Sequence, residues 1–128
     1  MAEAVFDASA LVDLLLGNDL GGAVRDRLAG HVLHAPAHID AEVLSALGRL
    51  HRAGELDAVS VEPELDALAP APIQRHPVHE LSAGAWARRH QLRLADTSYV
   101  ELAVSRGVPL VTTDRRLHAA PAADVVTA

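Results

Sequence analysis

Short apolar segments that favour β-structure alternate with helical patterns along this 128-residue chain, and this alternation constrains its fold more than any other feature. The apolar segment at residues 4–6 is followed by leucines at helical spacing that end at Gly17. A brief β-like segment at 32–36 is followed by an apolar stripe of helical period over 38–53. Strands and helices that alternate in this way pack as a parallel sheet, so the sequence predicts an α/β fold with helices on both faces of a central parallel sheet.

The remainder of the chain continues the alternation, and its length of 128 residues suits a single domain over 1–128, since domains usually contain about 100–150 residues. The further expected elements are a helix over 19–30, a partly helical stretch over 55–70 that Pro63 breaks or restarts, a short strand around Ile73, helices over 79–91 and 96–107, a buried strand over 108–113, one or two helical turns over 114–120 and an edge strand over 124–128.

Composition excludes several kinds of protein and site. The chain has no cysteine, so disulfides, thiolate metal ligands and a cysteine nucleophile are ruled out. Asp7 and Asp13 interrupt the apolar N-terminal stretch, and no other stretch approaches the roughly 18 apolar residues of a membrane span; we therefore expect no membrane segment and a cytoplasmic location. The net charge of −6 argues against a surface that binds nucleic acid over its whole area.

Four acidic residues stand where expected strands end or expected helices begin. Asp7 closes the first strand and Asp114 closes the strand near the C-terminus. Asp96 opens a helix, and Glu42 lies in the first turn or so of the helix over 38–53. In an open parallel sheet, ligands bind outside the carboxyl ends of the strands. We therefore expect the four side chains to share one rim of the sheet.

Each acid taken alone has a simpler interpretation. Asp7, Asp96 and Asp114 stand where aspartate commonly caps a helix, and Glu42 alone fits an exposed helix face. The four together indicate more, because clustered carboxylates repel one another and usually need a cation. Ligand sets made only of oxygen favour hard ions, which predicts Mg²⁺ or Mn²⁺. Such ions at carboxylates promote the hydrolysis of phosphodiesters.

Three stretches carry a family resemblance. These are VFDASALVDLLL at the N-terminus, HIDAEVLSALGRL in the middle and LADTSYVELAVSRGVPLVTTDRRL near the C-terminus. Together they sample almost the whole chain and resemble, in the expected order, the motif regions of the PIN-domain family, specifically the VapC-type toxin ribonucleases of type II toxin–antitoxin systems. The combination is specific, whereas any one of the three motifs alone is weak.

The resemblance implies a PIN fold and a metal-dependent endoribonuclease that acts as a toxin. It implies that Asp7, Glu42, Asp96 and Asp114 hold Mg²⁺ or Mn²⁺, with Asp7 and Asp96 the firmest ligands. Implied partners are an RNA substrate, a cognate VapB-type antitoxin that inhibits the enzyme, and a second copy of the chain in a homodimer.

Two hydroxyl residues match positions that often lie near this acidic quartet, and one position departs from the family pattern. Ser9 and Thr112 are candidate supporting donors behind the metal ligands, although local turn or helix-start capping explains them equally well. Ser45 stands where family members often carry asparagine, three residues after the helix glutamate, and this leaves the quartet intact.

Two other functions compete with a nuclease. A non-catalytic PIN-fold interaction module would keep the fold and use it only to bind a partner. An aspartate phosphoacceptor or phosphatase also places Asp at strand ends. Receiver domains, however, use a lysine and this chain has none, and Ser9 stands where the phosphatase pattern needs a second Asp.

Arg88, Arg89 and Arg93 are open to two interpretations. They could contact phosphate, or they could form a solvated helix face, and the sequence favours the solvated face.

Overall fold

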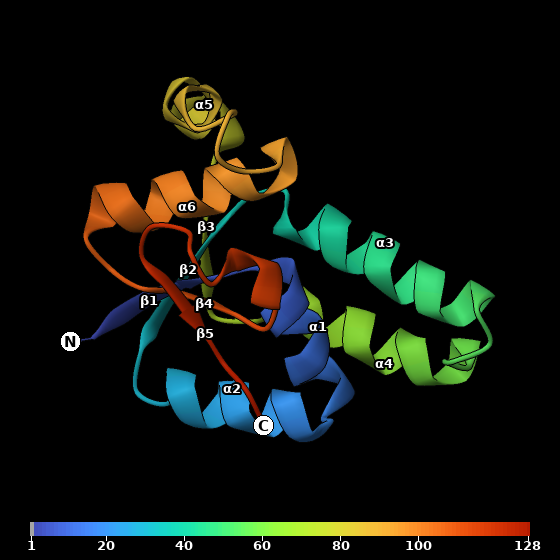
Figure 1. The fold of residues 1–128 in the computed structure, drawn as a ribbon. Helices are drawn as coiled ribbons and strands as arrows, with labels where there is room; N and C mark the ends of the chain where they lie inside the picture. Colours follow the sequence, from blue (N-terminus) through green and yellow to red (C-terminus); the bar gives the residue numbers. More distant parts are fainter. Residues whose placement is uncertain (1) are drawn as a thin grey trace.

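The computed structural model of the chain describes residues 2–128 and is built around a five-stranded sheet (Figure 1). All neighbouring strands are parallel, and their order is β3-β2-β1-β4-β5. The α/β prediction is confirmed, with the last strand at a sheet edge as expected. The strands are β1 (Glu3–Phe6), β2 (Val32–Pro36), β3 (Ile73–His76), β4 (Leu110–Thr112) and β5 (Ala123–Val125).

Helices lie on both sides of the sheet. In Figure 1, α6 lies on one side of the strands, with α5 on the face of α6 that points away from the sheet; α2 lies on the other side of the strands. Helices α3 and α4 pack together at the far end from the N-terminus. Within the described residues, no helix combines the length and apolar character that crossing a bilayer requires. The helices are α1 (Ala8–Leu16), α2 (Asp19–Leu28), α3 (Ile39–Arg52), α4 (Ala58–Leu68), α5 (Val78–Ala87), α6 (Leu94–Arg106) and the short 3-10 helix η1 (Arg115–Leu117).

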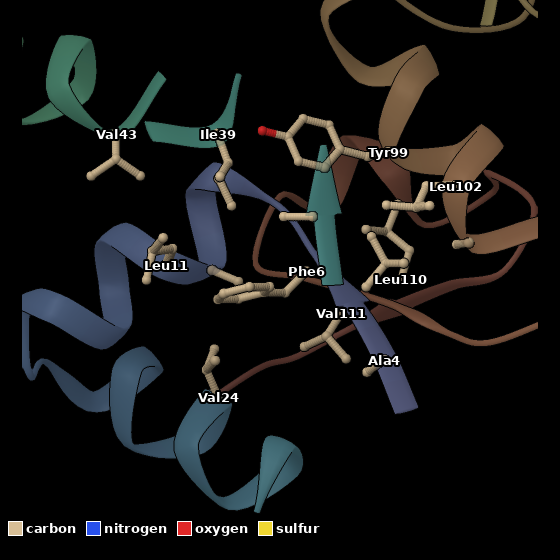
Figure 2. Packing of buried hydrophobic residues seen from close by; sticks show 14 of the residues in the cluster. Ala4, Phe6, Leu11, Val24, Ile39, Val43, Tyr99, Leu102, Leu110 and Val111 are labelled. Atoms are coloured by element: carbon tan, nitrogen blue, oxygen red, sulfur yellow. The ribbon is translucent and has the colours of Figure 1, made fainter. Parts of the chain in front are cut away.

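The hydrophobic core lies on both faces of the central strand. Ala4, Val5 and Phe6 of β1 are all fully buried, as expected for a parallel strand with helices on each side. Figure 2 shows Phe6 directed toward Leu11 of α1 and Val24 of α2. Burial of this apolar surface is the main stabilising term of the fold, and it holds β1 firmly in register between β2 and β4.

Three expected element boundaries are wrong. Helix α4 continues through Pro63, which neither breaks nor restarts it; the missing hydrogen bond falls at the carbonyl of Val59, an exposed residue. Helix α5 ends at Ala87, so the arginines that follow lie beyond it. Helix α6 begins at Leu94, so Asp96 lies inside its first turn and does not cap it.

Candidate active site

The candidate site lies where the strand order reverses. From β1 the chain proceeds to β2 and β3 on one side, and β4 and β5 occupy the other side. Val5 of β1 pairs with Leu110 of β4, and the two strands run in the same direction. Their carboxyl ends therefore meet, which brings Asp7, directly after β1, close to Asp114, two residues after β4. This reversal is the usual ligand site of an open parallel sheet.

Asp7 is a buried carboxylate whose hydrogen bonds come from neutral groups. It caps α1: its Oδ1 accepts from the Ala10 N–H at 3.0 Å and from the Ser9 hydroxyl at 2.7 Å. Its Oδ2 accepts from the Thr112 hydroxyl at 2.5 Å. Burial raises the pKa of Asp7 above its usual value, and these three hydrogen bonds only partly oppose the rise. Among residues 2–128 no basic side chain pairs with Asp7, so its charge lacks a counter-ion.

Thr112 joins the two strand ends. Besides donating to Asp7, its hydroxyl accepts the backbone N–H of Asp114 at 3.0 Å. The Ser9 hydroxyl lies 3.2 Å from the Thr112 hydroxyl, so both predicted hydroxyl residues contact the site. Thr112 is fully buried, and its contacts hold the backbone of Asp114 in a defined place relative to the Asp7 carboxylate.

Glu42 lies in the first turn of α3, as expected, and is held by two residues that the sequence did not indicate. The Tyr99 hydroxyl donates a hydrogen bond to Glu42 Oε1, and His38 Nε2 lies 3.2 Å from the same oxygen. Figure 2 shows the Tyr99 ring with its hydroxyl directed toward the start of α3. Burial opposes ionisation of Glu42, but these contacts and the charge of Arg93 hold its pKa below the usual value. Burial and the Glu42 carboxylate raise the pKa of Tyr99, so it remains a neutral donor.

Asp96 and Asp114 are covered by arginines. Arg93 Nε donates to Asp96 Oδ2 at 3.2 Å, and its Nη2 lies 4.0 Å from Asp114 Oδ2. Arg116 forms a two-point contact with Asp114, from Nε to Oδ1 at 3.0 Å and from Nη2 to Oδ2 at 2.7 Å. The hydrogen bonds from Arg116 hold the pKa of Asp114 below its usual value.

The four predicted acids gather at one rim but do not converge on one point. The Asp114 charge acts on Asp7, and the Arg93 charge acts on both Glu42 and Asp114. Within residues 2–128, however, no three His, Asp or Glu side chains come close enough to hold one metal ion. Arginine and tyrosine groups form hydrogen bonds with three of the four carboxylates. The donor chemistry nevertheless fits a divalent ion, because the ligands are oxygens and buried Asp7 pairs with no basic side chain of the described residues.

The arginines of this region do not behave as one solvated face. Arg88 pairs with Glu101 of α6 at 3.0 Å, and Arg89 lies over the Trp86 ring, 4.7 Å from its centroid. Arg93 alone of these three reaches the carboxylates. Its spacing of three residues from Asp96 is a signal that could have indicated the pair, whereas nothing local could have placed Tyr99 against Glu42.

The fold and the four acids at the carboxyl end of the sheet define the class of protein. It is an α/β protein whose candidate metal ligands are all carboxylate oxygens, at the point where the strand order of a parallel sheet reverses. The PIN domain family model matches residues 4–123. The chain belongs to the PIN-domain family, and the expected resemblance is confirmed.

Relatives and solved structures agree with this assignment. Ribonuclease VapC3 of Mycobacterium tuberculosis (strain ATCC 25618 / H37Rv) is 55% identical over 116 residues, which cover 90% of this chain and 85% of VapC3. The crystal structure of PAE2754 from Pyrobaculum aerophilum is 30% identical, with a TM-score of 0.68 over 97% of this chain and 84% of that one. A chain of a toxin–antitoxin complex from Klebsiella pneumoniae, 17% identical, shares the fold, with a TM-score of 0.66 over 96% of this chain and 97% of that one.

Proposed function

We propose that this chain is the toxic component of a type II toxin–antitoxin module, an endoribonuclease that hydrolyses RNA phosphodiester bonds. The observation that carries the proposal is the set of four acids near the strand-order reversal of a PIN domain, where buried Asp7 has no counter-ion among the described residues 2–128. High identity to a protein named Ribonuclease VapC3 over most of both chains supports the same activity. Ribonucleases of this family generally depend on divalent metal ions.

Mg²⁺ or Mn²⁺ is the cofactor we infer, held by Asp7, Glu42, Asp96 and Asp114. When bound, such an ion lowers the pKa of water and stabilises charge on phosphate oxygens. The chain's own groups prepare the site: Ser9 and Thr112 orient the Asp7 carboxylate, and Tyr99 and His38 orient Glu42. Each of these donors limits the rotation of a carboxylate, so the oxygens are in place before RNA arrives.

The proposed partners follow from the same family. A cognate VapB-type antitoxin is expected to inhibit the enzyme, and the fold shared with a chain of a toxin–antitoxin complex supports this. A cytoplasmic location and a single domain over residues 1–128 remain predictions.

Toxicity is tested by inducing the chain alone in a bacterial host. The wild-type chain should arrest growth, whereas the Asp96→Asn form should not. Equal growth of both strains would favour a non-catalytic interaction module.

A homodimer is supported by an exposed apolar groove. The groove, about 410 Å³ in volume, runs between α5 and the start of α6, and Trp86 and Leu94 along it are 58% and 59% exposed. Apolar side chains of this size, clustered and exposed, mark association surfaces. Trp86→Glu should shift the protein from dimer to monomer in analytical ultracentrifugation, while Val59→Glu, a change at an exposed valine on α4, should not. A wild-type monomer would contradict the dimer.

The decisive test of the activity is cleavage of RNA by purified protein. Wild type should cleave RNA only when Mg²⁺ or Mn²⁺ is restored after chelation. Asp7→Asn and Asp96→Asn should lose at least roughly a hundredfold in rate, because loss of a ligand exceeds the roughly 10- to 100-fold cost of losing a group behind it. Full activity in either variant would disprove the site, and labelling of Asp7 by acetyl phosphate would revive the phosphoacceptor alternative.

A further inference from the structure

Two arginines lie on the solvent side of two candidate metal ligands. The side chains of Asp96 and Asp114 are only 16% and 18% exposed. Those of Arg93 and Arg116 are 59% and 66% exposed. The guanidinium groups thus cover the carboxylates from outside and remain largely in solvent, so they can move away without opening the core.

The contacts involve three of the four oxygens of these two carboxylates. Both oxygens of Asp114 accept hydrogen bonds from Arg116, which donates its backbone N–H and Nε–H to Oδ1 and its Nη2–H to Oδ2. Arg93 takes Asp96 Oδ2 and approaches Asp114 Oδ2. A guanidinium and a divalent ion are both attracted to these oxygens, so metal binding at Asp114 and at Asp96 Oδ2 competes with the arginine contacts.

The guanidinium groups of Arg93 and Arg116, once released from the carboxylates, can bind phosphate. A guanidinium presents parallel N–H donors that match a phosphate as well as a carboxylate, and a two-point contact orients either one. Arg93 and Arg116 approach the site from two different segments, the residue before α6 and helix η1. A phosphate held beside Asp96 and Asp114 would therefore meet a donor from each.

We propose that Arg93 and Arg116 act as substitute cations for Asp96 and Asp114 in the metal-free enzyme, and that they bind the RNA phosphate once a divalent ion takes the carboxylates. This inference rests on the proposed ribonuclease function. It assigns the two arginines a double role, as competitors of the metal and as positioning residues for the substrate. It also explains how a protein of net charge −6 holds a polyanion at an acidic rim.

The chain offers a matched control. Arg115 stands between Asp114 and Arg116 in the same short segment and is exposed, yet it forms no ion pair within residues 2–128. Arg115→Ala and Arg116→Ala change the net charge equally. Any difference between the two variants therefore reports the contact with Asp114 and not the general electrostatic field.

The experiment measures metal and RNA separately. Calorimetric titration of metal-free protein with Mn²⁺ should give a Kd roughly two- to fivefold lower for Arg116→Ala and Arg93→Ala than for Arg115→Ala, the gain expected on removing an exposed ion pair. In saturating Mn²⁺, KM for a single-stranded RNA should rise roughly tenfold for the first two variants, since each loses a charged hydrogen bond to phosphate. Arg116→Lys should fall between wild type and Arg116→Ala in both measurements.

The two failures are distinguishable. If wild type cleaves RNA but Arg116→Ala and Arg93→Ala bind Mn²⁺ no more tightly than Arg115→Ala, the substitute-cation role is wrong and the ribonuclease proposal stands. If KM is unchanged, the phosphate role is wrong. If wild type neither binds Mn²⁺ nor cleaves RNA, the proposed function itself fails and the inference with it. Thermal melts check folding, and Arg116→Lys replaces Arg116→Ala if the alanine variant does not fold.

Discussion

At the scale of single residues, the site combines two kinds of carboxylate. Asp7 is buried among hydroxyl and backbone donors, and this burial raises its pKa, while no basic side chain in the part of the chain that the structure describes pairs with it. Asp96 and Asp114 lie nearer solvent and are paired with arginines. A cation bound beside Asp7 would offset the cost of burying its charge. At Asp96 and Asp114, the arginines provide the positive charge in the metal-free protein.

The Thr112 hydroxyl forms hydrogen bonds with both Asp7 and the backbone of Asp114. Thr112→Val preserves shape but removes the donor to Asp7 and leaves the partly buried N–H of Asp114 without its acceptor. We expect a loss of about 1–3 kcal/mol of unfolding free energy and a roughly 10- to 100-fold loss of ribonuclease activity. Urea denaturation and an RNA cleavage assay measure the two effects.

The neighbouring threonine provides the control. Thr113 donates its hydroxyl to Asp13 at 2.7 Å, whereas the Asp7 carboxylate accepts from Ser9, Ala10 and Thr112. Thr113→Val should leave activity unchanged and cost less stability than Thr112→Val, because Thr113 is partly exposed. If both variants lose activity equally, the hydroxyl of Thr112 has no special role in holding Asp7.

At the scale of elements, the close contact of α1 with α2 supports the site, because Asp7 caps α1. Gly21 of α2 permits this contact: a Cβ there would lie 2.0 Å from the backbone carbonyl oxygen of Asp13. Gly21→Ala should therefore destabilise the fold by about 1–3 kcal/mol, because backbone must move to relieve the overlap. Chemical denaturation followed by circular dichroism measures the change.

Gly22, one residue along the same helix, is the matched control. A Cβ at Gly22 would meet no atom within 4 Å. Gly22→Ala should stabilise the protein by about 0.5–1 kcal/mol, since alanine loses less backbone entropy in a helix than glycine does. Equal effects of the two substitutions would show that the helices separate easily and that their close approach is not required.

At the scale of the whole molecule, a chain of polar groups crosses three strands of the sheet. Buried His34 of β2 lies between Glu3 of β1, at 2.7 Å, and His76 of β3, at 2.9 Å, and Arg106 at the end of α6 pairs with Glu3 at 3.0 Å. Three strands and a helix therefore share one network. Burial lowers the pKa of His76, the charges of His34 and Arg106 lower it further, and Glu80 opposes the shift.

The lowered pKa of His76 predicts a pH dependence of stability. In the unfolded chain His76 binds a proton near its usual pKa of 6.5, while in the folded protein it resists protonation until lower pH. The unfolded state therefore binds more protons in this interval, and stability should fall as pH drops below about 6.5 toward the folded pKa. His76→Gln should make the free energy of unfolding less dependent on pH between about 7.5 and 5.5 in urea titrations.

Substitution of a different histidine separates the contribution of His76 from the pH dependence of stability that other groups cause. His79, on the exposed surface of α5, gives a suitable comparison. His79→Gln should retain the wild-type slope of stability against pH. If His76→Gln also retains the wild-type slope, the pKa of His76 does not differ between the folded and unfolded protein and the prediction is wrong.

The sequence by itself determined the order of strands and helices, the α/β class and the positions of the four acids along the chain. Local patterns were sufficient to predict these elements, because the spacing of apolar residues depends only on residues that are close together in the sequence. They failed at Pro63 and at the start of α6, where the observed helices extend past positions at which local residues suggested an end or a cap. The strand ends after Phe6 and Thr112 also bring Asp7 and Asp114 together, as the rule for parallel sheets predicts.

Only the tertiary structure decided how the acids are held. Tyr99 contacts Glu42 across 57 positions of sequence because α6 and α3 approach each other over the end of the sheet. Arg93 approaches Asp114 because the residue before α6 and the segment after β4 lie at the same rim. Such pairings depend on how elements pack, and packing is set by the shape of the whole core, which no local pattern encodes.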